Sequence, residues 1–325
     1  MKISWQTQMQ QAFTNYQALC EYLQLSPDEL NLSNDAAKKF PLRVPFAFAS
    51  RIEKGNLHDP LLRQILPIID ELKHYDGFSN DPVGDLNAVK QTGLLHKYHG
   101  RVLLINTGAC AIHCRYCFRR NFPYADLQLN KQQENDVIQT IQNGSSIQEV
   151  ILSGGDPLIL NDEQLARLFN KLSKIPTLKR IRIHTRLPIV LPDRMTNELL
   201  DIFKNCSKKV IVVIHSNHAN EIDADVAKAC QNLKLANVTL LNQAVLLHGV
   251  NDNVAALCDL SERLFEVGVL PYYLHFLDKA NGTGHFQVTE NVAMELLREV
   301  QNRLSGYLVP KLVVEKAGEL SKQYL

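Results

Sequence analysis

The stretch VLLINTGACAIHCRYC, residues 102–117, decides what kind of fold this chain adopts. It begins with an aliphatic run that is typical of a buried strand, and it passes directly into a loop rich in cysteine. Cys110, Cys114 and Cys117 follow the spacing C-x3-C-x2-C. A strand that leads into a cluster of thiols predicts an α/β protein with its functional site at the carboxyl end of that strand.

Runs of the same aliphatic kind continue downstream, and after the second run they recur about every 30 residues, the length of one βα unit. Helical patterns fill the intervals, with apolar residues on one face over 165–172 and again over 257–264. This rhythm predicts a partial (β/α)6 barrel, with a doubly wound parallel sheet as the alternative. The predicted strands cover residues 102–105, 149–152, 180–183, 210–214, 238–241 and 270–274.

The first 95 residues lack this rhythm and are expected to form a helical extension. Ser26, Pro27 and Glu29 have the form of a capping box with proline at the first helical position, which predicts the start of a helix. Residues 61–72 predict a largely buried helix, and residues 31–45 a loop. We expect three parts: the N-terminal extension (1–95), the barrel (96–290), and a C-terminal helix and segment (291–325).

The charge balance excludes several classes of function. Lysine and arginine number 35 against 34 aspartate and glutamate, so the net charge of +1 does not favour nucleic acid or an anionic membrane. We find no signal peptide and no run of about 18 apolar residues that would span a bilayer. The odd number of cysteines, 7, indicates reduced thiols and a cytoplasmic protein.

The three clustered thiols favour an iron–sulfur cluster. Three thiolates occupy three corners of a cubane and leave one iron open for catalysis, whereas structural metal sites are normally closed. The spacing alone leaves two alternatives open. One is zinc with His113 or His99 as its fourth ligand, and the other is a set of buried cysteines without a metal.

The run CAIHCRYCFRR, residues 110–120, resembles the radical S-adenosylmethionine superfamily, because an aromatic residue, Tyr116, precedes the third cysteine. Within that superfamily it is similar to the L-lysine 2,3-aminomutase family. The ending AGELSK, residues 317–322, resembles the branch of the family that serves β-lysylation of elongation factor P. The matching blocks extend from about Lys97 to Lys322.

The resemblance implies that Cys110, Cys114 and Cys117 hold a [4Fe-4S] cluster whose open iron binds S-adenosylmethionine. It also implies further contacts to that cofactor from the turn after the second strand and from the ends of the fourth and fifth strands. These residues are Ser153, Gly154, Gly155, Asp156, His215 and Gln243. The paired glycines suit close approach of a ligand, and Asp156 is expected to accept from the methionine ammonium.

A second cofactor, pyridoxal 5′-phosphate, is implied by the same resemblance. Lys322 occupies the position of the family's Schiff-base lysine, although the glycine-rich lead-in of the family is replaced here. Lys97, Tyr98 and Arg101 match the phosphate cradle, with Lys97 in place of an arginine. Lysine supplies the charge without the bidentate fork, so the sequence predicts a looser grip on the phosphate.

The resemblance also points to lysine as the substrate. Arg119 matches the residue that binds the substrate carboxylate, and Asp278 and Glu315 match those that face its distal ammonium. Glu315 stands where the free-lysine enzymes carry aspartate. We therefore expect a lysine 2,3-aminomutase that converts (S)-α-lysine to (R)-β-lysine, needs a reductant, and supplies a separate ligase that modifies elongation factor P. The alternatives are another radical S-adenosylmethionine enzyme, such as an RNA modifier, and a non-catalytic metal-binding module.

Overall fold

The computed structural model describes residues 3–127 and 129–325. Within them a 10-stranded sheet has its strands side by side in chain order. The strands are β1 (Val89–Gln91), β2 (Leu94–Tyr98), β3 (Arg101–Thr107), β4 (Glu149–Gly154), β5 (Arg180–Thr185), β6 (Lys209–His215), β7 (Thr239–Val245), β8 (Leu270–His275), β9 (Lys311–Val314) and β10 (Gln323–Tyr324).

The order of the parallel strands confirms the barrel and excludes the doubly wound alternative. Neighbours from β3 to β9 are all parallel, while β1–β2, β2–β3 and β9–β10 are antiparallel pairs at the two edges. A doubly wound sheet reverses its strand order at a switch point, and no such reversal occurs between β3 and β8. The six predicted strands are therefore β3 to β8 of a partial (β/α)6 barrel.

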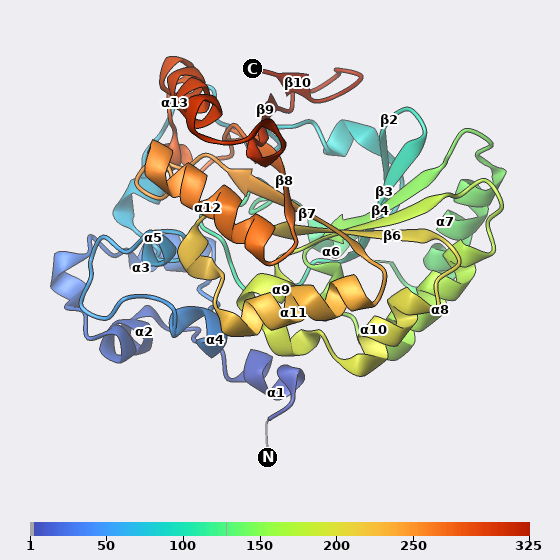
Figure 1. Ribbon diagram of the computed structural model, residues 1–325, viewed down its shortest axis with the longest axis horizontal. Helices are drawn as coiled ribbons and strands as arrows, with labels where there is room; N and C mark the ends of the chain where they lie inside the picture. The colour runs from blue at the N-terminus through green and yellow to red at the C-terminus, as the bar shows by residue number, and fades with distance from the viewer. Residues whose placement is uncertain (1–2, 128) are drawn as a thin grey trace.

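Helices connect the parallel strands and follow one another along one face of the sheet (Figure 1). As predicted, α8 buries Leu165, Leu168, Phe169 and Leu172, and α12 buries Leu257, Leu260 and Leu264. The helices are α1 (Trp5–Gln10), α2 (Tyr16–Leu23), α3 (Asn34–Lys39), α4 (Phe46–Ala49), α5 (Pro60–Arg63), α6 (Tyr124–Leu127), α7 (Lys131–Asn143), α8 (Asp162–Ser173), α9 (Leu187–Val190), α10 (Asn197–Lys204), α11 (Ala224–Leu235), α12 (Val254–Glu266) and α13 (Glu290–Arg303).

The N-terminal extension is more broken than its sequence predicts. The capping-box pattern gives only one 3₁₀ turn, η1 (Pro27–Glu29), and the Ser26 side chain makes no cap hydrogen bond. The helix predicted over 61–72 is split into α5 and a second 3₁₀ turn, η2 (Ile69–Leu72), because Pro67 between them has no N–H for a helical hydrogen bond. Conversely, the loop predicted over 31–45 contains α3, which the Ser33 hydroxyl caps.

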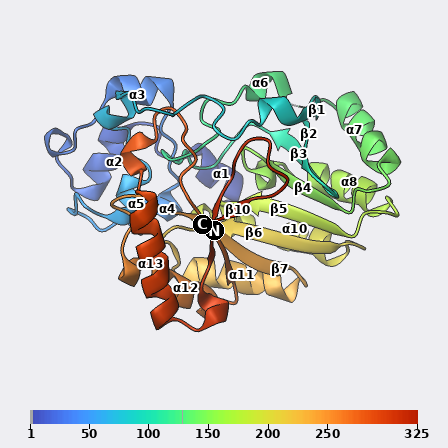
Figure 2. The ribbon, with the colours of Figure 1, turned by 90° about the horizontal axis from the view of Figure 1, so that it is seen from above.

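The extension shares one hydrophobic core with the barrel. Trp5, Leu19 and Phe48 pack in the same buried cluster as Leu187 and Val212. Figure 2 shows the N-terminal helices beside the barrel, and the boundary predicted at residue 95 falls inside β2. Among the described residues, no helix is both long and apolar enough to cross a membrane.

Candidate active site

A cavity of about 670 Å³ lies within the barrel and collects the residues that the sequence singles out. Its lining includes the cysteine loop that follows β3, the carboxyl ends of β4 to β8, and the terminal hairpin of β9 and β10. Every predicted site residue lines it: Lys97, Tyr98, Arg101, Cys110, Cys114, Cys117, Arg119, Ser153, Gly154, Gly155, Asp156, His215, Gln243, Asp278, Glu315 and Lys322.

The cysteine loop fits a cluster better than it fits zinc. Within residues 3–127 and 129–325, no three histidine, cysteine or acidic side chains converge on one point that would hold a single metal ion. A cubane places each thiolate on a different iron and does not need that convergence. The two proposed fourth zinc ligands also point elsewhere, since the His113 Nδ1 lies 2.7 Å from the Pro41 carbonyl oxygen and His99 is exposed outside the cavity.

The thiols themselves are held in an environment that suits metal binding. Burial, together with the neighbouring thiols, raises the pKa of Cys110 well above its usual value and the pKa of Cys117 to about 11. Thiolates at such positions need a compensating positive charge, which metal coordination provides. The three cysteines would therefore hold an iron–sulfur cluster as their compensating cation.

The N-terminal extension fixes the cysteine loop through backbone and ion-pair contacts. The His113 amide donates to the Arg43 carbonyl at 3.0 Å, and the Arg115 amide donates to the Gln64 carbonyl at 2.9 Å. The fully buried Arg115 guanidinium donates from Nε to Glu71 at 2.7 Å. Sequence reasoning missed these contacts because their partners lie far apart in the chain.

The glycine–aspartate turn after β4 packs closely against the cysteine loop. A Cβ on Gly155 would lie 2.2 Å from the Ala109 carbonyl oxygen, so this glycine lets the cysteine loop approach closely. The Asp156 carboxylate accepts from the Thr185 hydroxyl and the Arg186 amide, both at 2.7 Å, and from the Leu158 amide at 3.1 Å. Those donors leave little capacity for an ammonium group from a cofactor.

His215 and Gln243 stand opposite each other in the parallel pairing of β6 and β7. Burial and the charge of Arg186 lower the pKa of His215 to about 3, so its imidazole is neutral. Its Nε2 lies 3.3 Å from the Tyr116 hydroxyl, the aromatic residue of the cysteine motif. His215 and Gln243 therefore give this wall of the cavity a neutral polar surface, next to the charged Arg186.

An alternating chain of charges crosses the opposite wall. Arg119 Nε donates to Asp85 at 2.7 Å, and the other oxygen of Asp85 pairs with Lys97 Nζ at 2.6 Å. Lys97 also donates to Glu315 at 2.8 Å, and Glu315 pairs in turn with Lys322. Ion pairs thus connect the predicted substrate residues, Arg119 and Glu315, with the predicted cofactor residues, Lys97 and Lys322. The sequence did not single out Asp85, which links Arg119 to Lys97.

The Lys97 ammonium has three partners within the protein. It donates to the Val83 carbonyl at 2.8 Å, as well as to Asp85 and Glu315. An ammonium has three N–H donors, and these contacts occupy all of them. A phosphate would need another donor, and Arg182 on β5 offers one, because its Nε is buried without a partner among the described residues.

Arg182 belongs to a basic group near the amino ends of the strands. It pairs with Glu149, as does Arg180 at 2.8 Å, and Glu149 lies in register between Arg101 and Arg180. All four residues line the cavity. The alternation of Arg180, Ile181 and Arg182 was the sequence signal for this polar face, because a strand covered on both sides should be apolar throughout.

The two acidic residues that the sequence predicts to face the distal ammonium, Asp278 and Glu315, have opposite pKa shifts. Burial raises the pKa of Asp278 to about 7, only partly offset by the charge of Lys322. Burial also opposes the charge of Glu315, but the ammonium groups of Lys322 and Lys97 outweigh it and hold the pKa of Glu315 well below its usual value. Of these two acids, Asp278 is therefore the one that forms no ion pair in the part of the chain that the structure describes.

Comparisons with known proteins agree with this geometry. A family described as a 4Fe-4S single cluster domain matches residues 99–206. The L-lysine 2,3-aminomutase of Escherichia coli (strain K12) is 47% identical over 319 residues, covering 98% of this chain and 93% of that protein. The L-lysine 2,3-aminomutase of Haemophilus influenzae is 46% identical with 98% and 94% coverage, and that of Clostridium subterminale is 34% identical with 97% and 76% coverage.

Solved structures of low sequence identity are also similar to this chain. A radical SAM methyltransferase from Sphaerobacter thermophilus is 16% identical with a TM-score of 0.47, covering 70% of this chain and 69% of that one. The structure described as native anSMEcpe with bound AdoMet and Cp18Cys peptide is 12% identical with a TM-score of 0.46, and the coverage is 62% and 58%.

The partial barrel and the three-thiol loop that follows its first parallel strand, together with the 4Fe-4S family match and the L-lysine 2,3-aminomutase relatives, define a radical S-adenosylmethionine enzyme. Within that class, the chain belongs to the L-lysine 2,3-aminomutase family. It is therefore an isomerase of a family whose cofactors are a [4Fe-4S] cluster, S-adenosylmethionine and pyridoxal 5′-phosphate.

Proposed function

We propose that the chain converts (S)-α-lysine to (R)-β-lysine. The observation that carries this proposal is one cavity that holds three thiols, Lys322, and the carboxyl groups of Asp278 and Glu315. The acidic pair suits the distal ammonium of lysine, and no neutral or acidic side chain of a substrate would need it. Relatives named L-lysine 2,3-aminomutase support the same substrate.

The cofactors divide the cavity between them. Cys110, Cys114 and Cys117 would hold the [4Fe-4S] cluster, and S-adenosylmethionine would lie against the polar wall of His215 and Gln243, next to the turn at Ser153, Gly154 and Gly155. In this arrangement Asp156 is a positioning residue, because its carboxylate holds the ends of β4 and β5 together. When bound, these groups supply a carbon radical, and pyridoxal phosphate supplies a π-system that carries the migrating nitrogen.

Pyridoxal phosphate would bind covalently to Lys322. Tyr98, Arg101 and Arg182 would hold its phosphate, and Lys97 would act indirectly by fixing Asp85 and Glu315. Support for this division comes from the occupied donors of Lys97 and the unpartnered Nε of Arg182.

The substrate would then be held at both ends by residues of this chain. Arg119 would bind its carboxylate, since Asp85 and Ser153 already orient the guanidinium, with contacts of 2.7 and 3.1 Å. Asp278 and Glu315 would bind the distal ammonium. The protein's contribution is to align the reacting atoms and exclude water, which is the main service of such sites to radical chemistry.

The place of the product in the cell follows from the sequence resemblance. The resemblance at residues 317–322 supports a role in which a separate ligase attaches the β-lysine to elongation factor P, and the odd number of cysteines favours the cytoplasm as its place. The test is to supply purified elongation factor P, its ligase and the enzyme's product, and to look for the mass increment of β-lysine on the factor. Equal modification with α-lysine would contradict this role.

The enzymatic proposal is tested by anaerobic reconstitution with iron, sulfide and pyridoxal phosphate. Lysine, S-adenosylmethionine and a strong reductant are added, and β-lysine is sought by chromatography. Losing one partner of a desolvated charge pair costs about 2–5 kcal/mol, so Asp278→Asn and Glu315→Gln should lower kcat/KM about 30- to 4000-fold. Glu315→Asp keeps the charge and should lose less. Near-normal turnover in both neutralised variants would exclude lysine as the substrate.

Trapping with borohydride tests the cofactor lysine separately. The reagent should fix pyridoxal phosphate on the peptide that contains Lys322, because it reduces the imine to a stable amine. Lys316 is exposed and lies close to Lys322 in the chain, so it is the matched control. A label found on Lys316 in place of Lys322 would contradict the assignment.

A further inference from the structure

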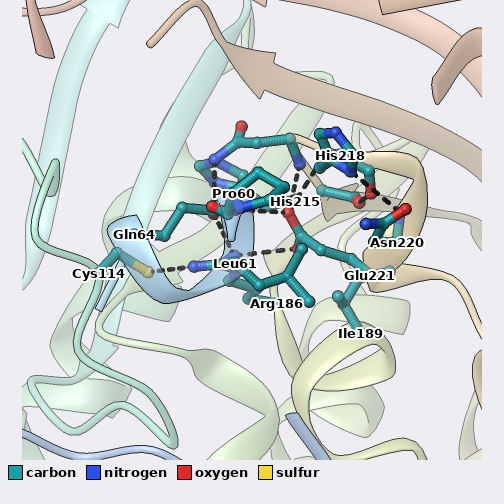
Figure 3. Close-up of polar contacts among 12 residues, drawn as sticks. Pro60, Leu61, Gln64, Cys114, Arg186, Ile189, His215, His218, Asn220 and Glu221 are labelled. Atoms are coloured by element: carbon teal, nitrogen blue, oxygen red, sulfur yellow. Dashed lines mark hydrogen bonds and ion pairs between the residues drawn. The ribbon is translucent and has the colours of Figure 1, made fainter. Parts of the chain in front are cut away.

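A buried polar network lies directly behind the cysteine loop. Arg186, which follows β5, donates from Nη1 to the sulfur of Cys114 at 2.8 Å. Its Nη2 donates to Gln64 Oε1 at 2.7 Å and to Glu221 Oε2 at 3.0 Å (Figure 3). The Arg186 side chain is only 6% exposed, so these contacts form where water cannot replace them.

Glu221 balances the charge of Arg186 inside this network. Its side chain is fully buried, and its carboxylate also accepts from the Asn217 amide at 2.9 Å and from the His218 amide at 3.1 Å. The loop after β6 therefore holds Glu221 in place independently of Arg186. The cation beside Cys114 is fixed in position and partly neutralised at the same time.

Gln64 ties this network to the N-terminal extension. Its side chain accepts from Arg186 and donates from Nε2 to Glu221 at 3.1 Å. Its backbone carbonyl accepts from the amide of Arg115, the residue directly after Cys114. One residue of the extension thus holds both the cysteine loop and the arginine that contacts its middle thiol.

We infer that Gln64 and Glu221 are positioning residues that aim the Arg186 guanidinium at Cys114, and that this cation sets the reduction potential of the cluster. The inference rests on the proposed role of Cys114 as a cluster ligand. A charged N–H donor stabilises sulfur more strongly when the cluster carries the extra negative charge of the reduced state. The contact should therefore make the cluster easier to reduce.

This arrangement predicts shifts of opposite sign in two variants. Arg186→Gln removes the cation, so at the wild-type midpoint potential the ratio of reduced to oxidised cluster should fall about tenfold, which equals about 59 mV for one electron. Glu221→Gln removes the counter-charge and keeps the shape, so the potential should rise. Gln64→Leu changes no charge but frees the arginine, so the potential should fall by less than in Arg186→Gln.

The measurement is a potentiometric titration of the reconstituted cluster, followed by electron paramagnetic resonance, with iron and sulfide determined for each variant. The control is the ion pair between Arg194 and Asp162, at 2.8 Å. Arg194 is fully buried, and the structure records no contact between it and a thiol. Asp162→Asn should leave the potential unchanged. General damage to the fold would not shift the potential in opposite directions.

The outcomes separate this inference from the proposed function. If the wild-type protein assembles no four-iron cluster, the proposed function itself fails. If the cluster assembles and Glu221→Gln has an unchanged or lower potential, the inference is overturned. If the Arg186→Gln protein loses its iron, the Arg186→Lys variant is measured in its place. Lysine keeps the positive charge but lacks the forked donor geometry of the guanidinium. A potential in Arg186→Lys between those of the wild type and Gln64→Leu supports the inference, and one below that of Gln64→Leu contradicts it.

Discussion

Asp278 gives the substrate assignment a pH signature. Its carboxyl group has a pKa raised to about 7 by burial, so it is neutral below that pH and ionised above it. Only the ionised form pairs with an ammonium. Attachment of pyridoxal phosphate to Lys322 removes a positive charge that lowers this pKa, so the pKa of Asp278 in the loaded enzyme lies above 7. We therefore expect the affinity of the pyridoxal-loaded enzyme for lysine to fall about tenfold for each pH unit below the pKa of Asp278, and to level off above it. Spectral titration with lysine across this range measures the effect.

L-Norleucine is the matched control ligand, because it has the same α-amino acid group and no distal amine. The pH effects that do not involve the distal amine change the affinity for both ligands equally. The ratio of lysine affinity to norleucine affinity therefore reports the ionisation of Asp278 alone. The ratio should lose its dependence on pH in Asp278→Asn. Parallel profiles for the two ligands in the wild-type protein would place the distal amine away from Asp278.

At the level of single residues, the sequence predicts which side chains share the cavity better than it predicts what each contacts. All of the residues expected from the resemblance line one cavity. Lys97 and Asp156, however, have their donors and acceptors occupied by the protein itself. Spacing along a chain shows which groups converge, but it does not show which partners satisfy them.

Strand β5 carries the next prediction, because Arg182 lines the cavity and its Nε has no partner within the described part of the chain. A hydrogen bond to a charged group contributes about 1.5–3 kcal/mol, so Arg182→Gln should weaken binding of pyridoxal phosphate about tenfold to 150-fold. Pyridoxal without its phosphate should bind equally well to the variant and the wild type. Equilibrium binding to the apo-protein measures both ligands.

Lys97→Met is the comparison variant for the cradle. Lys97 is saturated by Val83, Asp85 and Glu315, so its loss should disturb pyridoxal and pyridoxal phosphate to the same extent. A selective loss of pyridoxal phosphate binding in Lys97→Met, with none in Arg182→Gln, would restore the cradle predicted from the sequence.

The turn after β4 sets a limit on how the cysteine loop packs. Gly155→Ala would force a Cβ to within 2.2 Å of the Ala109 carbonyl oxygen, which must move. We expect a loss of about 1–3 kcal/mol in the free energy of unfolding, and lower iron content after reconstitution. Gly306→Ala is the control, since nothing lies within 4 Å of its added Cβ. Urea denaturation and iron analysis test both; equal iron content in the two variants would show that the turn does not position the loop.

Secondary structure was predictable where periodicity was long and regular. The spacing of apolar residues predicts each barrel strand, and it predicts the faces of α8 and α12 that are buried in the structure. The extension was not predictable in the same way, because Pro67 ends the hydrogen-bonding pattern inside an apolar run that otherwise reads as helix. Short helices there are stabilised by packing against the barrel more than by their own sequence.

The shared core predicts that the whole chain unfolds as one unit. Trp5 is the only tryptophan, it is buried, and the Arg194 guanidinium lies 4.6 Å from the centre of its ring. Tryptophan fluorescence therefore reports on the extension, while far-ultraviolet circular dichroism is dominated by the barrel. The two transitions should coincide in denaturant. A fluorescence transition at a clearly lower denaturant concentration than the circular dichroism transition would indicate that the extension unfolds independently.

For the molecule as a whole, the cysteine loop and the βα rhythm were sufficient to predict the barrel. The packing of the N-terminal extension against the site was not predictable. The hydrogen bond that links them joins Gln64 and Arg186, which lie 122 positions apart in the chain. A single sequence carries no record of such a pairing. The predicted division at residue 95 accordingly separates segments that share one core and one site.

Lys322 is joined to the barrel through the segment 316–321, every residue of which is exposed. Exposed segments of this kind are preferred sites of proteolytic nicking. One cut after Lys316 by trypsin would leave the strands up to β9 covalently intact and separate from them the one side chain proposed to bind pyridoxal phosphate covalently. A preparation clipped there would look almost unchanged on a sizing column while having lost its attachment point. The mass of the intact chain is therefore the purity criterion to check before any activity is measured.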